Sequence, residues 1–147
     1  MFKSILVPID GSDHAEKAVS VAGDLAAKYD ATLHIITVME STELPRALHR
    51  FAEAEHITGA EAQVATYISD RFVERACEVA EEAGAKSVET AVVMGDVQDK
   101  VLEYAEKVGA DLIVMGSRGL SDFKGLMLGS VSHKIANSAP CTVITVR

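Results

Sequence analysis

The sequence predicts an α/β protein, a Rossmann-like doubly wound sheet of five parallel strands in an α/β/α sandwich with strand order 3-2-1-4-5. Short apolar runs alternate along the chain with longer segments whose apolar residues recur at helical spacing. The short runs are apolar at consecutive positions, which is typical of strands that helices cover on both faces. Right-handed crossovers then wind the helices onto both faces of the sheet. The chain has 147 residues, 48% of them apolar, and therefore predicts one domain spanning residues 1–147.

The first strand, helix and second strand are expected within the first forty residues. Lys3–Ile9 is an apolar run that stops at the turn sequence DGSD. Asp13 and Glu16 have the spacing of a capping box, so Asp13 is expected to cap a helix that continues to Tyr29. Thr32–Met39 reads TLHIITVM, and this β-branched, apolar composition predicts a second buried strand.

The polar segment Glu40–Gly59 follows, and because it shows no clear period we expect a long loop there. Beyond it the two patterns alternate again. Helices are expected over Ala60–Ala83, with Gly84 as its C-cap, over Val97–Val108, with Gly109 after it, and over Ser130–Ser138. Strands are expected at Ser87–Met94, Asp111–Met115 and Cys141–Val146.

The charge balance and the cysteine usage exclude several classes of protein. A formal net charge of −8 leaves no basic surplus to neutralise nucleic-acid phosphates. No apolar run approaches the roughly 20 residues that span a membrane, and the N-terminus lacks the pattern of a signal peptide. Cys77 and Cys141 form no CxxC motif, so neither a disulfide framework nor a zinc site is expected. We expect a cytoplasmic protein with no nucleic-acid partner and no membrane insertion; adaptation to high salt would leave the same acidic surplus.

The most informative stretch is the glycine-rich segment Gly116–Ser132, which follows a predicted strand. Ligands of open α/β sheets bind at the carboxyl ends of strands, and glycines there let backbone N–H groups approach an anion. Gly129-Ser130 opens a helix whose first N–H groups and dipole also favour an anion, and Ser132 adds a hydroxyl. The segment has neither the GxxxxGK[ST] nor the GxGxxG pattern. A polyphosphate ligand is favoured, although glycine-rich loops also occur without a ligand.

Three motifs together resemble one family. The spacing Gly116-x2-Gly119-x9-Gly129-Ser130 resembles the G-x2-G-x9-G-[ST] signature of ATP-binding universal stress proteins. The opening ILVPIDGS at Ile5–Ser12 resembles the family's first strand and its aspartate. The ending SAPCTV at Ser138–Val143 resembles the family's closing motif, with Thr142 where many members have proline. The resemblance covers essentially the whole chain and implies the ATP-binding branch of the family.

The resemblance also implies a role for particular positions. It implies that the adenine and ribose side of the nucleotide meets Pro8, Ile9 and Asp10, and that the adenine pocket is lined by Val38, Met39 and Met94. The ribose and first phosphates would contact Met115, Gly116, Arg118 and Gly119. The later phosphates would be held by Gly129, Ser130, Val131 and Ser132. From the residues themselves, Asp10 could hold a ribose hydroxyl or a Mg²⁺ ion on the phosphates, or could be a turn residue. Arg118 could contact phosphate or face solvent. The three methionines could converge on one pocket or pack in the core.

The implied ligand is ATP, with AMP or ADP as alternatives and Mg²⁺ as a companion of the phosphates. The apolar last strand, residues 141–147, is an edge that a second copy could cover, so a homodimer is expected and a tetramer is the alternative. The family's roles suggest a nucleotide-dependent regulator in stress response that controls a partner such as a membrane transporter. The other hypotheses are a slow ATPase or nucleotidyl-transfer enzyme, and a chaperone-like structural dimer. We expect no catalytic residues, because no P-loop lysine or recognisable triad is present.

Overall fold

A computed structural model describes residues 1–40, 60–118 and 129–147 of the chain. Strands alternate with helices throughout these ranges, as the periodicity predicts. In chain order the elements are β1 (Ser4–Ile9), α1 (Asp13–Tyr29), β2 (Thr32–Met39), α3 (Ala60–Glu82), β3 (Ser87–Met94), α4 (Val97–Lys107), β4 (Leu112–Gly116), α5 (Ser130–Ser138) and β5 (Thr142–Val146). The expected boundaries agree with these to within one residue, and residues 41–59 of the expected loop lie outside the described ranges.

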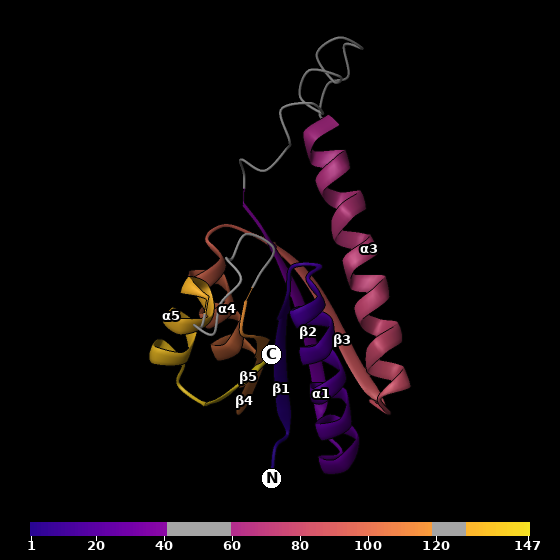
Figure 1. Cartoon of the computed structure of the whole chain (residues 1–147), viewed down its shortest axis with the longest axis vertical. Helices are drawn as coiled ribbons and strands as arrows, with labels where there is room; N and C mark the ends of the chain where they lie inside the picture. Colours follow the sequence, from indigo (N-terminus) through magenta and orange to yellow (C-terminus); the bar gives the residue numbers. More distant parts are fainter. Residues whose placement is uncertain (41–59, 119–128) are drawn as a thin grey trace.

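The five strands form one parallel sheet in the order β3-β2-β1-β4-β5, which confirms the predicted topology. Helices α1 and α3 cover one face, and α4 and α5 cover the other (Figure 1). Strand order reverses beside β1, because the chain adds β2 and β3 on one side and β4 and β5 on the other. The carboxyl ends on either side of such a reversal are where open α/β sheets bind ligands.

The pairing of β1 with its two neighbours is uneven. β1 pairs with β2 from Ser4↔Thr32 to Ile9↔Thr37, over its whole length. Its register with β4 contains only Ile5↔Leu112 and Leu6↔Ile113. The carboxyl-terminal part of β1 is therefore held by β2 alone, and the β1–β4 boundary is the place where the edge of the sheet can admit a ligand.

Alternation along the strands divides the core into two clusters. Ile5, Val7 and Ile9 pack with α1 and α3, whereas Leu6 packs with α4 and α5. The largest fully buried side chains of the two clusters are aliphatic and come mostly from the central strands: Ile5, Leu33, Ile35 and Leu112 on one face, and Leu6, Ile36, Ile113 and Ile135 on the other. Burial on both faces explains why the strands are apolar at consecutive positions.

Helix α1 begins one residue earlier than the capping box predicts. Ser12, not Asp13, is the N-cap, and its Oγ accepts a hydrogen bond from the Ala15 amide at 3.2 Å. The turn before it explains the shift, because Gly11 has a φ of +80° and the Ser12 amide donates to Asp10 Oδ1 at 2.9 Å. Asp13 is instead the first helical residue, where its negative charge favours the helix dipole.

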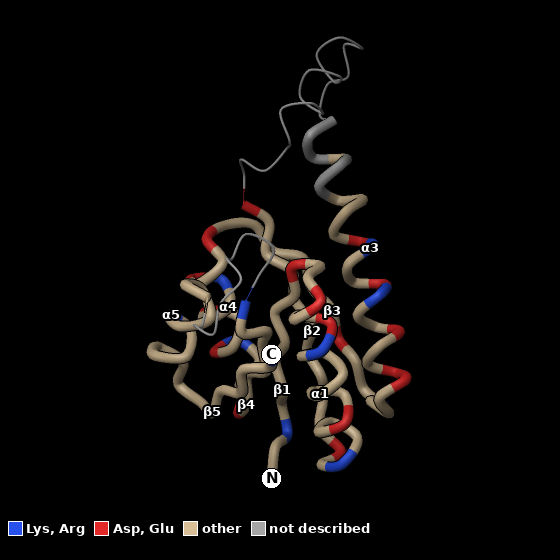
Figure 2. Tube along the Cα trace, viewed as in Figure 1, with Lys and Arg blue, Asp and Glu red and all other residues tan. Residues whose placement is uncertain are grey.

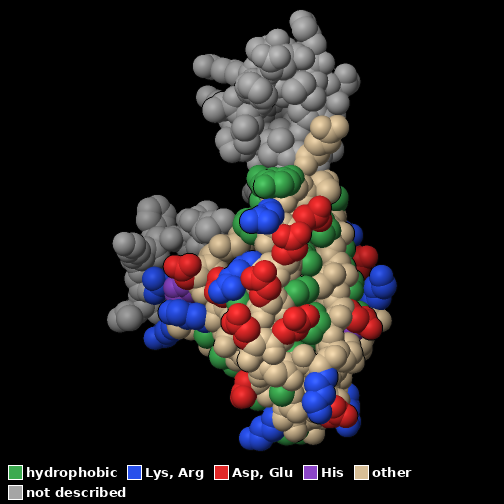
Figure 3. Space-filling view, turned by 90° about the vertical axis from the view of Figure 1, so that its right-hand side faces the viewer, with side chains coloured by type: hydrophobic (Ala, Val, Ile, Leu, Met, Phe, Trp, Pro, Cys, Tyr) green, Lys and Arg blue, Asp and Glu red, His purple; other side chains and the backbone are tan. Residues whose placement is uncertain are grey.

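Charged side chains of both signs alternate along α3 and on the face that lies to the right in Figure 1 (Figures 2 and 3). Glu74 and Glu78 make ion pairs of 3.3 Å with Arg71 and Arg75, one helical turn away, and all four side chains are exposed. This arrangement is that of a solvated helix face. Within the described ranges, no helix is both long enough and apolar enough to cross a membrane.

Candidate functional site

The carboxyl ends of the strands form one edge of the sheet, at the upper side of Figure 1. The turn Asp10-Gly11-Ser12 follows β1, and the glycine-rich segment begins at the end of β4. β2 and β3 end as register partners at Met39 and Met94, and the Gly95 amide donates to the Met39 carbonyl at 3.0 Å. The sheet therefore gathers at one edge the four strand ends that the sequence assigns to the site.

The two ends of the glycine-rich segment are held against each other. The Gly129 amide donates to the Ser117 carbonyl at 2.7 Å, and Ser132 Oγ donates to the Gly116 carbonyl at 2.8 Å. The Ser117 amide in turn donates to the Val146 carbonyl of β5 at 2.7 Å. These bonds place the first turn of α5 directly beside the end of β4. Gly119 lies in the stretch 119–128, outside the described residues, so its predicted contact stays a prediction.

The N-terminus of α5 differs in its capping from those of α1 and α4. Ser12 and Asp96 cap α1 and α4 by accepting hydrogen bonds from Ala15 and Asp99 amides. The N-cap of α5 is Gly129, which has no side chain to accept such a bond. The first N–H groups of a helix have no partner within the helix, and in the described ranges no N-cap side chain accepts from those of α5, so they suit an anion.

The predicted phosphate residues differ in what their side chains can do. Ser130 is exposed at the first position of α5, and Val131 is also exposed, with 39% of its surface accessible. Ser132 is buried, with 7% of its surface accessible, and its hydroxyl proton is donated to Gly116. Ser132 therefore holds α5 against the end of β4, and of the two predicted hydroxyls that of Ser130 is the exposed one.

Arg118 carries a buried donor directly after β4. Its Nε atom is buried and finds no hydrogen-bond partner among the residues that the structure describes. Leaving a buried polar group unpaired costs about 1–3 kcal/mol, and more for a charged group. An anionic ligand could supply the acceptor that this Nε–H group lacks. Arg118 lies two residues after Gly116, at the start of the glycine-rich segment.

Gly116 makes a close approach to α1. A Cβ atom added at Gly116 would lie 2.8 Å from the Cβ of His14 and 2.9 Å from its carbonyl carbon. The His14 ring lies beside the next residue, with Nδ1 3.2 Å from Ser117 Oγ. Sequence reasoning attached no role to His14, because the contact joins residues 103 positions apart and no local pattern indicates it.

The residues expected around the adenine lie on different sides of the sheet. Val38 packs on the α4 and α5 side, as does Met115 of the expected ribose contact, and alternation places Pro8 on the same side. The side chain of Ile9 faces the opposite side, where it is buried among α1 and α3. Alternation along β2 and the register with β3 place Met39 and Met94 on the side of Ile9, so the expected wall residues divide between the two sides.

The three methionines do not converge on one pocket. Met39 and Met94 are register partners at the ends of β2 and β3, and Met94 has 58% of its surface exposed. Met115 is almost fully buried, and β1 separates its strand from β2. Met39 and Met94 can flank a ligand at the sheet edge, whereas Met115 belongs to the core beneath it.

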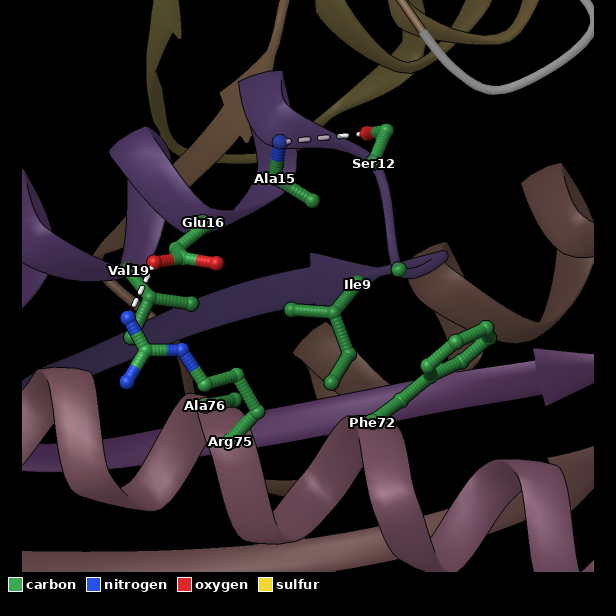
Figure 4. Close-up of a pocket in the computed structure, with 9 residues that line it drawn as sticks. Ile9, Ser12, Ala15, Glu16, Val19, Phe72, Arg75 and Ala76 are labelled. Carbon is green, nitrogen blue, oxygen red and sulfur yellow. Dashed lines mark hydrogen bonds and ion pairs between the residues drawn. The ribbon is translucent and has the colours of Figure 1, made fainter.

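A cavity of about 70 Å³ lies on the other face of the sheet, between α1 and α3 (Figure 4). Ile9 and Phe72 point into it, and the ion pair between Glu16 and Arg75 crosses its mouth at 2.5 Å. The Phe72 ring lies so close to Gly11 that an added Cβ would be 2.3 Å from the ring. Among the described residues, those that this mainly apolar cavity shares with the predicted site and the turn after β1 are Ile9, Gly11 and Ser12.

Neither cysteine has the environment of a reactive thiol. Burial raises the pKa of Cys77 and of Cys141, and the carboxylates of Glu81 and Asp111 add to the effect.

In the described part of the chain, no group of three or more His, Cys, Asp or Glu side chains could hold a metal ion. Asp10 is fixed by the Ser12 amide on the turn after β1, at the same sheet edge as the α5 N-terminus. The features that point to a ligand are thus those of an anion site.

Comparison with known proteins assigns the family. A profile of the Universal stress protein family matches residues 1–147. The universal stress protein YxiE of Bacillus subtilis is 37% identical over 149 residues, which cover 100% of both chains. A solved universal stress protein in complex with cAMP is 30% identical, with a TM-score of 0.71, over 99% of this chain and 97% of that chain. UspA from Lactobacillus plantarum is 28% identical, with a TM-score of 0.77 and the same coverage. The chain therefore belongs to the universal stress protein family.

Proposed function

We propose that the chain binds an adenine nucleotide, ATP in the first instance, at the carboxyl edge of the sheet and acts as a nucleotide-dependent regulator. One observation carries the proposal: the end of β4 and the first turn of α5 are bonded together through Ser117 and Gly129. The junction brings the start of α5, whose N-cap residue has no side chain, against Ser117, the residue before Arg118, whose Nε is buried without a hydrogen-bond partner among the described residues. Donors and positive charge at one place favour a phosphate group.

The adenine part of the proposal is supported by the solved relative in complex with cAMP, whose sequence is 30% identical over nearly the whole chain. In this chain Pro8 and Val38 lie on the side of the sheet where α5 begins, and Met39 and Met94 lie at the same edge. The apolar side chains suit the base of a nucleotide, and the N–H donors at the start of α5 suit its phosphates. ATP is proposed first because the spacing of Gly116, Gly119 and Gly129-Ser130 resembles the signature of the ATP-binding universal stress proteins.

A Mg²⁺ ion would accompany the nucleotide and not occupy a site of the protein's own. Mg²⁺ keeps several waters and is commonly held by substrate phosphates and one or two carboxylates. Asp10 is the carboxylate that the turn after β1 offers, with its Oδ1 held by the Ser12 amide. The same carboxylate could instead accept a ribose hydroxyl, so the two roles for Asp10 are alternatives within the proposal.

The regulatory part of the proposal follows from what a bound nucleotide would join. It would connect the turn after β1 with the β4–α5 junction, across the boundary where β1 and β4 pair least. Binding would stabilise this one arrangement and so change how the surface docks to a partner. We also propose that the protein is cytoplasmic, that β5 pairs two copies into a homodimer, and that the regulated partner is another protein such as a transporter.

The test uses one charge placed at two ends of the same helix. Ser130→Asp sets a carboxylate where the phosphate would lie, and it also favours the helix dipole, so the fold should be retained. Ser138→Asp is the matched control, because it adds the same charge at the exposed last residue of α5. We expect isothermal titration with ATP, AMP and cAMP to show binding to the wild type and to Ser138→Asp, and a loss of at least tenfold for Ser130→Asp.

Each outcome decides a different part of the proposal. A wild-type chain that binds none of the nucleotides refutes nucleotide binding, and equal affinities for the two variants refute the position of the phosphates. Mass spectrometry of the ligand that co-purifies would separate ATP from AMP. Multiple-turnover release of ADP faster than about one per second would replace the regulator by an enzyme.

A further inference from the structure

The contact between His14 and Ser117 joins two parts of the chain that the sheet itself joins weakly. His14 is the second residue of α1, directly after the turn that carries Asp10. Ser117 follows β4, and β4 shares only two register pairs with β1. The 3.2 Å contact between His14 Nδ1 and Ser117 Oγ therefore spans the boundary at which the ligand would sit.

Burial makes this contact costly to lose. Ser117 has 2% of its surface exposed, and its amide and carbonyl are engaged by Val146 and Gly129. A hydroxyl in such a place must donate its proton or leave it unpaired. Ser117 Oγ and His14 Nδ1 therefore share a hydrogen bond at this contact, and the tautomer of the imidazole decides which of the two atoms donates.

The contact also determines where the phosphate donors lie. The Ser117 carbonyl is the acceptor of the Gly129 amide, so the position of Ser117 sets the position of the first turn of α5. The backbone of His14 fits against Gly116 on the other side of the same contact. A displacement of Ser117 would thus move both ends of the glycine-rich segment relative to the Asp10 turn.

We propose that His14 is a positioning residue of the nucleotide site, which through Ser117 holds the phosphate-binding end of the site in its binding-competent arrangement. The inference rests on the proposed nucleotide binding and adds a residue that does not itself touch the ligand. Its effect is on the fraction of molecules with Ser117 and the first turn of α5 correctly placed, and the apparent affinity falls in proportion to that fraction.

Two substitutions of His14 separate the hydrogen bond from the bulk of the ring. His14→Asn keeps a hydrogen-bonding partner for Ser117 Oγ, because the amide oxygen and nitrogen lie as many bonds from Cβ as Nδ1 does. His14→Leu removes that partner and leaves the Ser117 hydroxyl unpaired. We expect isothermal titration to show ATP affinity within twofold of wild type for Asn and about tenfold weaker for Leu, which corresponds to about 1.4 kcal/mol.

A double variant gives the sharper test. Removing both partners of a buried hydrogen bond costs less than removing one, because no polar group is left unpaired. His14→Leu with Ser117→Ala should therefore bind ATP more tightly than His14→Leu alone. Adenosine, which lacks phosphates, should bind all the variants alike, because His14 acts on the phosphate end of the site.

Amide exchange in the absence of nucleotide reports the same contact independently. We expect the Gly129 amide to lose protection in His14→Leu and to keep it in His14→Asn. Equal ATP affinities for wild type and His14→Leu overturn the inference, as does an equal loss of ATP and adenosine binding, which would indicate general destabilisation. If the wild type binds no nucleotide at all, the proposed function fails first and this inference falls with it.

Discussion

Replacing Gly116 by alanine tests whether this glycine serves the ligand or the packing of the fold. An added Cβ would lie 2.8 Å from His14 Cβ, 2.9 Å from the His14 carbonyl carbon and 3.1 Å from the Ala15 amide nitrogen. Two of these neighbours are backbone atoms of α1, which cannot turn away as a side-chain tip can. α1 packs on β4, so the added methyl group must push the helix and the strand apart.

The cost follows from overpacking. Forcing an extra carbon into a well-packed contact typically costs about 1–3 kcal/mol, and the backbone neighbours place Gly116→Ala toward the upper part of that range, about 2–3 kcal/mol. For a chain of about 150 residues, a loss of 1 kcal/mol lowers Tm by roughly 2–4 °C, so we expect a decrease of about 4–12 °C. Loss of nucleotide binding in this variant would therefore not by itself locate the phosphates.

Urea denaturation followed by circular dichroism measures the effect, with Gly109→Ala as the matched control. An added Cβ at Gly109 meets no atom within 4 Å, but its φ of +59° costs alanine about 1–2 kcal/mol. We expect Gly116→Ala to lose at least as much stability as the control with an unchanged m-value. A Gly116→Ala variant as stable as the wild type would refute the steric argument and leave ligand binding as the reason for a glycine at this position.

Two further predictions concern the sheet. Burial lowers the pKa of His34 below its ordinary value of 6.5, and the Glu89 carboxylate opposes this only in part. The unfolded chain therefore binds the proton more readily than the folded chain does. The stability that comes from keeping His34 neutral is complete above about pH 6.5 and is lost as the pH falls. His34→Gln should flatten the fall of the urea midpoint between about pH 7 and pH 5, and an unchanged slope would contradict this. Thr145 is exposed on the edge strand β5, so Thr145→Lys should convert the proposed homodimer into a monomer in analytical ultracentrifugation, whereas a persistent dimer would place the interface elsewhere.

The sheet could be predicted from the sequence because its determinants are local. Runs such as Thr32–Met39 are apolar at consecutive positions, and Gly84 and Gly109, both at positive φ, mark the ends of helices. The capping of α1 was predicted one residue late because two adjacent residues can both accept from a helix amide. The Asp10–Gly11 turn, which decides between Ser12 and Asp13, depends on backbone geometry that the pattern does not specify.

The site was predictable in its position along the chain but not in its side-chain contacts. The strand-end rule and the glycine spacing indicate Gly116 and Gly129 without any knowledge of packing. Strict alternation along β1 could also have shown that the side chains of Pro8 and Ile9 face opposite sides of the sheet, since neighbours on a strand do. The contact of His14 with Ser117 depends on how α1 lies across β4, which no sequence pattern encodes.

The short register between β1 and β4 divides the sheet into two groups of strands. β1, β2 and β3 pair over long continuous stretches on one side of this boundary, and β4 and β5 pair on the other. Across the boundary, packing of α1 on both β1 and β4 supplements the few backbone hydrogen bonds. A molecule bound at the carboxyl edge would add a third connection between the two groups.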